Sequence, residues 1–139
     1  MSMPTGRKIT LVPRSLTSAD LPDPFWEIDL LKEQGYEAPD PARVKFQLSL
    51  DIGPVGSAAA DTFQCIVVTE ELKNTLRGNA NIILMDTYSY GKFKENILSI
   101  IANCEADTWY GCIVNLRRYF SWEYEGMYSE AEIRRLNDR

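Results

Sequence analysis

Residues 44–52 alternate apolar and polar side chains without a break, and this stretch limits the fold more strongly than any other. Successive side chains of a β-strand point to opposite faces, so the pattern predicts a half-buried antiparallel strand. A helix would bring residues three or four apart onto one face instead. The apolar positions are Val44, Phe46, Leu48, Leu50 and Ile52.

The following residues predict partners for this strand. Residues 53–60 form a loop rich in small side chains, and residues 61–69 form a returning strand with Phe63, Cys65 and Val67 on one side. Residues 82–85 are all apolar, which predicts a central strand covered on both faces. A short strand is also expected at residues 8–12, ended by Pro13.

Helical patterns dominate the second half of the chain. Apolar residues recur at helical spacing from Phe93 to Cys104 and again over residues 107–120, so two amphipathic helices are expected to pack antiparallel. Ser129 and Glu132 are spaced as a capping box, which predicts a short helix over residues 129–137 that carries Ile133 and Leu136.

Two further helices are expected nearer the N-terminus. Residues 25–34 are read as a short helix that ends at Gly35. Thr69 is read as the N-cap of a helix that ends at Gly78, because two glutamates follow it in the first turn.

This order of elements predicts an α+β fold, since strands come mostly first and helices mostly last. We expect one domain over residues 1–139, with an antiparallel sheet of about four to five strands packed against two or more helices in two layers. A chain of this length buries about two-thirds of its unfolded surface without help from metals or disulfides. Residues 13–41, which hold five of the seven prolines, are expected to be largely irregular.

Negative charge is concentrated in this irregular segment. The chain carries a net charge of −5, and residues 17–40 contain many acids against Lys32 alone. One interpretation is a solvated surface that aids solubility. The other is a docking face for a basic protein, because opposite potentials speed the encounter and orient it. Nucleic acid is not expected as a direct ligand, because an acidic surface repels phosphates.

The docking interpretation predicts that acids and aromatic residues of this segment bind the partner together. Aromatic side chains bury large areas at little entropic cost, so they are favoured anchors. Phe25 and Trp26 have an equal alternative role, which is to pin the segment onto the sheet. The candidate partner-binding residues are Asp23, Phe25, Trp26, Glu27, Asp29, Glu33, Tyr36, Glu37 and Asp40.

The chain contains no histidine, which limits the chemistry it can perform. The commonest general base, the commonest zinc ligand and the usual third member of nucleophilic triads are therefore missing. No nucleotide-binding glycine loop, Cys-x-x-Cys or calcium-loop spacing occurs either. We expect no enzyme activity, no cofactor and no metal. The most plausible pair for a carboxylate-based hydrolase is Glu123 with Glu125.

The cysteines and the apolar runs bear on the compartment. Cys65, Cys104 and Cys112 are odd in number and lie within apolar patterns, which favours buried reduced thiols over disulfides. The first ten residues lack the apolar core of a secretion signal, and no apolar run approaches the roughly 18 residues of a membrane span. These features predict a cytoplasmic protein that does not associate with membranes.

Residues 104–125 are unusually aromatic. Helical spacing accounts for Trp109, but it does not account for Trp122-Glu123-Tyr124. In a structural interpretation, Trp122 and Tyr124 point to one face of a short strand and close the core, while Glu123 accepts hydrogen bonds from the backbone or from Arg118. In the other interpretation these residues contact a partner.

Several of these motifs occur in one order along the chain. An alternating strand enters Ile52-Gly53-Pro54 and Gly56, and Asp61-x-Phe63 leads the next strand. The later motifs are Tyr88/Tyr90, Asp107-Thr108-Trp109, Leu116, Arg118-Tyr119 and Trp122-Glu123-Tyr124. This order resembles the immunity protein 8 family of bacterial polymorphic toxin systems over about residues 42–126. That family usually has Trp-Glu-Phe where this chain has Tyr124.

The resemblance implies a small cytoplasmic protein that is encoded beside a secreted toxin and neutralises it. Its partner would be the cognate toxin, for which a nuclease is a reasonable guess, because nuclease surfaces are often basic. The family motif residues would be Trp109, Tyr119, Trp122, Glu123 and Tyr124, with a mainly structural role. A general protein- or ligand-binding module, or a carboxylate-based hydrolase, are the alternative functions.

Overall fold

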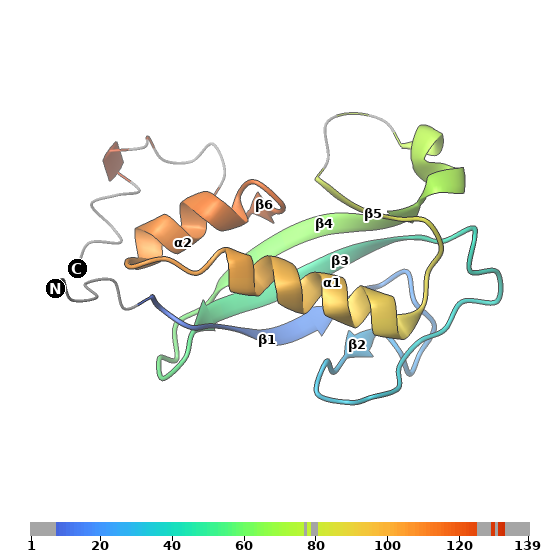
Figure 1. Ribbon diagram of the computed structural model, residues 1–139, viewed down its shortest axis with the longest axis horizontal. Coiled ribbons are helices and arrows are strands. Elements are labelled where there is room, and N and C mark those ends of the chain that lie inside the picture. The colour runs from blue at the N-terminus through green and yellow to red at the C-terminus, as the bar shows by residue number, and fades with distance from the viewer. Residues whose placement is uncertain (1–7, 77, 79–80, 125–128, 130, 133–139) are drawn as a thin grey trace, which may run out of the picture.

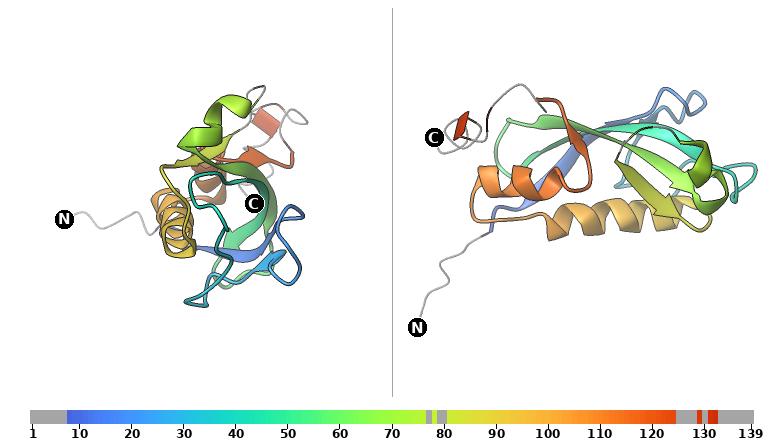
Figure 2. Two further views of the ribbon diagram at one scale, coloured as in Figure 1. Left: turned by 90° about the vertical axis from the view of Figure 1, so that its right-hand side faces the viewer. Right: turned by 90° about the horizontal axis from the view of Figure 1, so that it is seen from above.

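The computed structural model describes residues 8–76, 78, 81–124, 129 and 131–132. Within them the chain forms a sheet with helices on one side of it, in two layers (Figures 1 and 2). The expected α+β class is confirmed. The elements are β1 (Leu11–Thr17), β2 (Glu27–Ile28), β3 (Lys45–Pro54), β4 (Asp61–Thr69), the 3₁₀ helix η1 (Glu70–Thr75), β5 (Ile82–Met85), α1 (Tyr90–Asn103), α2 (Trp109–Leu116) and β6 (Ser121–Trp122).

The strand order across the described sheet is β2-β1-β3-β4-β5, and β6 also pairs with β4. All neighbours are antiparallel except β4 and β5, which are parallel. The expected hairpin forms between β3 and β4, with Lys45 opposite Val68 and Ile52 opposite Asp61. β3 and β4 are the longest of the described strands, and each has a neighbour on both sides.

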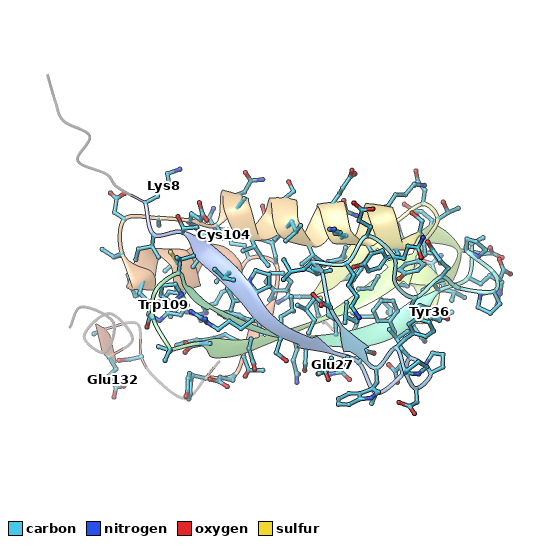
Figure 3. All side chains as sticks on the ribbon, turned by 90° about the horizontal axis from the view of Figure 1, so that it is seen from below. Lys8, Glu27, Tyr36, Cys104, Trp109 and Glu132 are labelled. Atoms are coloured by element: carbon cyan, nitrogen blue, oxygen red, sulfur yellow. The ribbon has the colours of Figure 1, made fainter. Side chains whose placement is uncertain are left out.

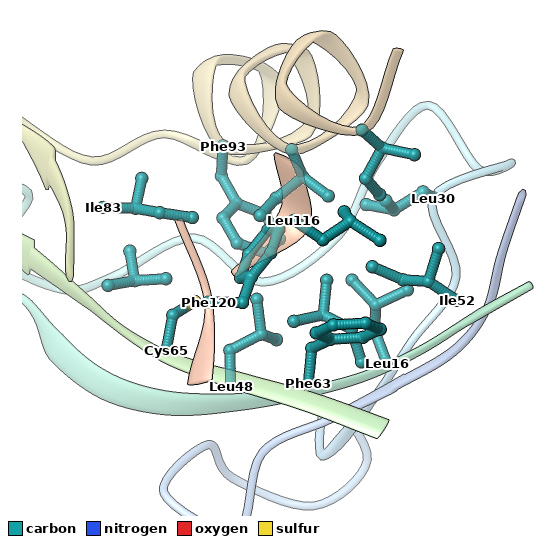
Figure 4. Packing of buried hydrophobic residues seen from close by; sticks show 14 of the residues in the cluster. Leu16, Leu30, Leu48, Ile52, Phe63, Cys65, Ile83, Phe93, Leu116 and Phe120 are labelled. Carbon is teal, nitrogen blue, oxygen red and sulfur yellow. The ribbon is translucent and has the colours of Figure 1, made fainter. Parts of the chain in front are cut away.

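The core lies between the sheet and the helices. The predicted apolar face of β3 is buried, because Phe46, Leu48, Leu50 and Ile52 all turn toward the helical layer. Figure 4 shows Leu48 and Phe63 of the sheet pointing toward Phe120, which follows α2. Fully burying one such side chain contributes about 1.5–3 kcal/mol to folding. The alternation of apolar and polar residues in β3 therefore determines which face of the sheet packs against the helices.

Both long helices begin as capped amphipathic helices. The Ser89 hydroxyl caps α1 by accepting from the Lys92 amide at 3.2 Å, and the Thr108 hydroxyl caps α2 by accepting from the Gly111 amide at 3.0 Å. The expected antiparallel packing of the two helices is wrong. α2 turns back after α1, but the two helices cover different parts of the sheet and contact each other little (Figures 1 and 2). Each contributes buried residues to the common core.

The first strand differs from the prediction at Pro13. β1 continues through this proline to Thr17, and the register against β3 shifts between Pro13 and Ser15. Proline is tolerated there because it stands at an irregularity, and because β2 pairs only with Leu16 and Thr17. Pro13 therefore has a strand partner on one side only.

The helix expected over residues 25–34 is wrong. The segment forms turns around the short strand β2 instead. The amide of Phe25 donates to the Pro22 carbonyl at 2.6 Å, and the amide of Leu31 donates to the Asp29 carboxylate at 2.9 Å. Aspartate side chains that bond the backbone two residues on favour turns over helices, and proline restricts the residues before it.

Two predictions in the middle of the chain also fail. Thr69 precedes the short 3₁₀ helix η1, and its hydroxyl does not cap it. The hydroxyl instead accepts from the Val44 amide at 3.1 Å and donates to the Ala42 carbonyl at 2.7 Å, tying β4 to the start of β3. β5 is not central but lies at the sheet edge, where Ile82 and Leu84 are exposed. Short apolar runs do not distinguish these two positions.

The remaining predictions concern the C-terminus, the thiols and the membrane. The capping box is present, since the Ser129 amide donates to Glu132 at 3.0 Å and the Glu132 amide donates to Ser129 at 3.2 Å. Ile133 and Leu136 lie outside the described residues. All three cysteines are free and buried, and burial raises the pKa of Cys65 to about 12 and that of Cys104 to about 11. No helix within the described ranges is long and apolar enough to cross a membrane.

We predict that the chain unfolds as one cooperative unit without metal or disulfides, because one connected core joins the sheet and both helices. Urea unfolding followed by fluorescence and by circular dichroism should give one coincident transition. EDTA and a thiol reductant should leave its midpoint unchanged. Two separated transitions, or a midpoint that falls in EDTA, would contradict this prediction.

Candidate protein-binding site

The acidic segment, residues 20–40, lies at one end of the molecule. Figure 3 places Glu27 and Tyr36 at this end, and Cys104 and Trp109 at the other. The segment connects β1 to β3 and includes β2. Its acidic side chains are all exposed, so the structure brings the predicted acids onto one part of the surface. These are Asp20, Asp23, Glu27, Asp29, Glu33, Glu37 and Asp40.

Four of these carboxylates hold the segment in place. Asp20 accepts from the Gln47 amide at 2.8 Å, which joins the segment to β3. Glu37 accepts from the Tyr90 amide at 2.9 Å, which joins it to the start of α1. Asp29 and Asp40 accept from amides two residues on, which stabilises local turns. These acids therefore have a structural role.

The other three acids are Asp23, Glu27 and Glu33. Their carboxylates accept no hydrogen bond within the described part of the chain, and they are exposed to solvent. A carboxylate without an internal partner keeps its full charge available to an approaching protein. These three side chains are the ones best placed to attract a basic partner.

The two buried tyrosines of the Tyr88/Tyr90 motif, at the start of α1, hold the acidic segment in place through hydrogen bonds. The Tyr90 hydroxyl lies 2.8 Å from the Asp29 carbonyl and 2.9 Å from the Lys32 carbonyl, and donates to them. The Tyr88 hydroxyl donates to the Tyr36 carbonyl at 2.8 Å. Burial raises the pKa of both hydroxyls, so both stay protonated donors at neutral pH.

Gly35 allows this anchor to form. A Cβ at this position would collide with the ring of Tyr90, so the backbone approaches the ring closely only because residue 35 is glycine. Gly35 therefore does not end a helix, contrary to what its place after residues 25–34 predicted. Its actual role is to let the acidic segment lie against the ring.

Two leucines, together with Tyr36, attach the segment to the core. Leu21 and Leu30 are buried, whereas 40% of Phe25 and 47% of Trp26 are exposed. Phe25 still contacts Tyr36, with ring centroids 5.8 Å apart, so it packs within the segment. Neither ring pins the segment onto the sheet. Leu31, which the sequence analysis did not single out, is 92% exposed.

A cavity of about 240 Å³ opens in this end of the molecule. Residues 21–36 of the acidic segment and the start of α1 form its walls. Five aromatic residues line it, together with Glu27 and Asp29. The exposed apolar side chains, the uncompensated acids and the cavity therefore coincide on one surface.

The Trp122 motif lies on the other half of the molecule, where β6 pairs with β4 (Figure 1). Trp122 is buried, its indole N–H donates to the Asp61 carboxylate at 2.9 Å, and the Tyr124 ring lies 5.2 Å from its own. The guanidinium carbon of Arg117 lies 5.4 Å from the centroid of the indole ring, over its face. The two rings thus contact each other, although β6 ends at Trp122 and Tyr124 lies in the turn that follows it.

The other motif residues are less buried. Trp109 opens α2 and is partly buried against the core, while Tyr119 is exposed. Glu123 is also exposed, and its amide donates to the Thr62 carbonyl at 3.0 Å. Glu125 lies outside the described residues, so the structure does not place it beside Glu123. Groups of three or more metal-ligating side chains do not occur in the described part of the chain.

The Asp61 carboxyl, which bonds the Trp122 indole, has a raised pKa. Burial raises its pKa above the usual 3.8, the Trp122 hydrogen bond lowers it, and the charge of Glu123 raises it again. The net effect is a raised pKa, so the ionised form is disfavoured in the folded protein.

The comparisons with known proteins give one match. The family model described as Immunity protein 8 matches residues 25–127, about three quarters of the chain. The match includes residues 25–40 of the acidic segment, which lie outside the stretch of about residues 42–126 on which the sequence resemblance rests. Neither the curated proteins nor the solved structures give a significant match.

We predict that Tyr90→Phe loosens the acidic segment while the core stays folded. The change removes the hydroxyl that bonds the Asp29 and Lys32 carbonyls, so it should cost about 1–2 kcal/mol. Hydrogen exchange should speed up at residues 29–36 and stay slow in β3 and β4. Tyr119→Phe, at the other end, serves as the control and should change neither measurement. Equal protection of residues 29–36 in wild type and Tyr90→Phe would disprove the anchor.

We predict that Asp61→Asn stabilises the protein at neutral pH. Because the pKa of Asp61 is raised on folding, its ionisation lowers stability as the pH rises above 3.8. Asparagine keeps an oxygen for the Trp122 indole but carries no charge. The midpoint of thermal unfolding should therefore rise at pH 7, and the gain should vanish below pH 3.8.

Proposed function

The chain belongs to the immunity protein 8 family, and we propose that it binds a cognate bacterial toxin domain and neutralises it by non-covalent occlusion. The encounter would take place in the cytoplasm of the producing cell. Neither turnover nor a cofactor is required, since a bound protein that covers the toxin's working surface is enough to silence it. Affinity of nanomolar or better, about −12 kcal/mol, is expected for this role.

The observation that carries the proposal is the coincidence of charge and exposed apolar surface on residues 20–40. Asp23, Glu27 and Glu33 carry uncompensated charge, and Phe25, Trp26 and Leu31 are exposed beside them. Exposed aromatics near the centre of a patch, rimmed by charge, are the usual composition of a protein-binding surface. The segment is fixed by buried tyrosines and leucines, so little order has to form on binding.

The acidity of the surface favours a basic toxin. A nuclease fits this description, because the surface that holds nucleic acid phosphates is positively charged. An acidic protein that covers such a surface attracts the toxin at long range and also excludes its substrate. Direct binding of nucleic acid, membranes or metal ions forms no part of the proposal.

The test uses the toxin domain encoded beside this chain's gene. Reversing the uncompensated acids, as Asp23→Lys, Glu27→Lys and Glu33→Lys together, should slow association with that domain by roughly tenfold or more at low salt. Added salt should slow association of the variant less than that of the wild type, because salt screens the electrostatic attraction and the variant has lost most of it. Thermal stability should stay nearly unchanged, since these side chains make no internal hydrogen bond.

A matched variant separates position from net charge. Glu95→Lys, Asp107→Lys and Glu123→Lys change the total charge equally, but these exposed residues lie outside the acidic segment. This control should slow association much less. Equal slowing in both variants would show that net charge alone matters. Failure of wild-type protein to bind the neighbouring toxin domain, or to protect cells that express it, would refute the proposed function itself.

A further inference from the structure

The cavity in the acidic segment combines aromatic walls with carboxylates. The buried residues Tyr88, Tyr90 and Phe93 form its inner wall, and the more exposed Phe25 and Tyr36 form its outer wall. Figure 3 shows Tyr36 and Glu27 at the same end of the molecule. This composition differs from the surface of the sheet's open side, where Gln47, Ser49 and Gln64 lie near Asp20 and no aromatic residue lines the hollow.

The cavity has the size of one side chain rather than of a cofactor. Its volume is about 240 Å³, whereas small-molecule pockets generally have about 300–1,000 Å³. A cavity of about 150 Å³ can hold a benzene molecule. There is room here for a planar group of similar size together with a few methylenes.

The lining favours a positively charged occupant. Aromatic faces attract cations because their quadrupole is negative above the ring plane. Glu27 and Asp29 add negative charge. The Glu27 carboxylate accepts no hydrogen bond from the residues that the structure describes, and that of Asp29 accepts one from the Leu31 amide, which leaves it further acceptor capacity. The tyrosine hydroxyls are already directed to backbone carbonyls, so they do not compete for these carboxylates.

Lys32 lines the cavity and opposes this attraction, and the Lys94 ammonium, which donates to the Lys32 carbonyl at 3.1 Å, lies beside it. The Lys32 side chain is exposed, and the hydrogen bonds of Lys32 that hold the segment use its backbone carbonyl. A lysine ammonium on its flexible stem can turn into solvent when another cation enters. Its charge still weakens entry, so its removal should strengthen the binding of a cation and leave the binding of a neutral group unchanged.

We propose that this cavity receives an arginine side chain of the toxin, which then holds the bound complex together. The proposal rests on the proposed function and names the chemistry of its central contact. Arginine suits the site better than lysine, because the planar guanidinium stacks on aromatic rings while its N–H groups pair with carboxylates. Asp23 and Glu33, which do not line the cavity, then govern the encounter, while Glu27 and Asp29 govern the lifetime of the complex.

The first experiment tests the cavity without the toxin. The full chain is titrated with the peptide Ac-Gly-Arg-Gly-NH₂, and the ring signals of Phe25 and Tyr36 are followed by NMR. Saturable shifts in the millimolar range are expected for arginine and weaker ones for the lysine peptide. The citrulline peptide, a neutral isostere of arginine, should give none. Glu27→Gln with Asp29→Asn should abolish the arginine response, and Lys32→Gln should strengthen it.

The second experiment measures dissociation of the neighbouring toxin domain. Glu27→Gln with Asp29→Asn should speed dissociation by roughly tenfold or more. The matched pair Asp23→Asn with Glu33→Gln removes the same charge from the same segment, and should slow association but leave the dissociation rate within about twofold. Asparagine and glutamine preserve the shapes of the side chains, and asparagine retains the acceptor for Leu31.

The outcomes separate this inference from the function on which it rests. Equal binding of the arginine and citrulline peptides, or no saturable arginine response, overturns the assignment of the cavity. Unchanged dissociation of the toxin from the cavity pair also overturns it, while the proposed function stands as long as the wild type still binds. If the wild type fails to bind the toxin domain, the proposed function falls, and the peptide titration still decides what the cavity recognises.

Discussion

The one-sided burial of β3 is the constraint on which the rest of the structure depends. Its apolar residues face α1 and α2 and its polar residues face solvent, so a slip of one residue would exchange the two sets. β1 and β4 take their register from this strand, and β5 and β6 take theirs from β4. The helices then cover the apolar side, which leaves the opposite face polar and the acidic segment at the end of the sheet.

The acidic segment obtains its order in a different way. It has almost no regular structure, and side chains supply the hydrogen bonds that a helix or strand would supply through its backbone. Carboxylates of Asp20 and Glu37 accept from amides of β3 and α1, and hydroxyls of Tyr88 and Tyr90 donate to carbonyls within the segment. An irregular surface is therefore presented in a fixed shape, which favours binding because less conformational freedom is lost.

Helices and strands with a clear local pattern were predicted correctly from the sequence. The predictions were wrong where contacts between residues distant in the sequence determine the structure. The hairpin of β3 and β4, the helices α1 and α2 and the apolar face from Phe46 to Ile52 follow from periodicity. The helix at residues 25–34 was predicted wrongly because an Asp29 turn and pairing with β1 prevail over helical spacing. Similarly, nothing local shows that β5 lies at an edge.

For the candidate site, amino-acid composition identified the segment. It did not show which of the segment's residues hold it in place and which are exposed to a partner. Residue type alone does not separate Glu37, which bonds the Tyr90 amide, from Glu33, which bonds nothing within the described chain. It also did not show that Leu21 and Leu30 are buried while Phe25, Trp26 and Leu31 are exposed. These assignments depend on which side chains α1 and β3 can reach, and that is known only once the fold is known.

The strand β6, which carries Trp122, and the acidic segment around β2 lie in different halves of the molecule (Figure 1). Substitutions at well-separated sites generally have additive effects on stability. After gene duplication, one copy can therefore accumulate substitutions around the 240 Å³ cavity and come to bind a different toxin. The hydrogen bond between the Trp122 indole and Asp61 still stabilises the scaffold. The surface that we propose binds the toxin can therefore change in response to changes in the toxin, while the core around Trp122 is preserved.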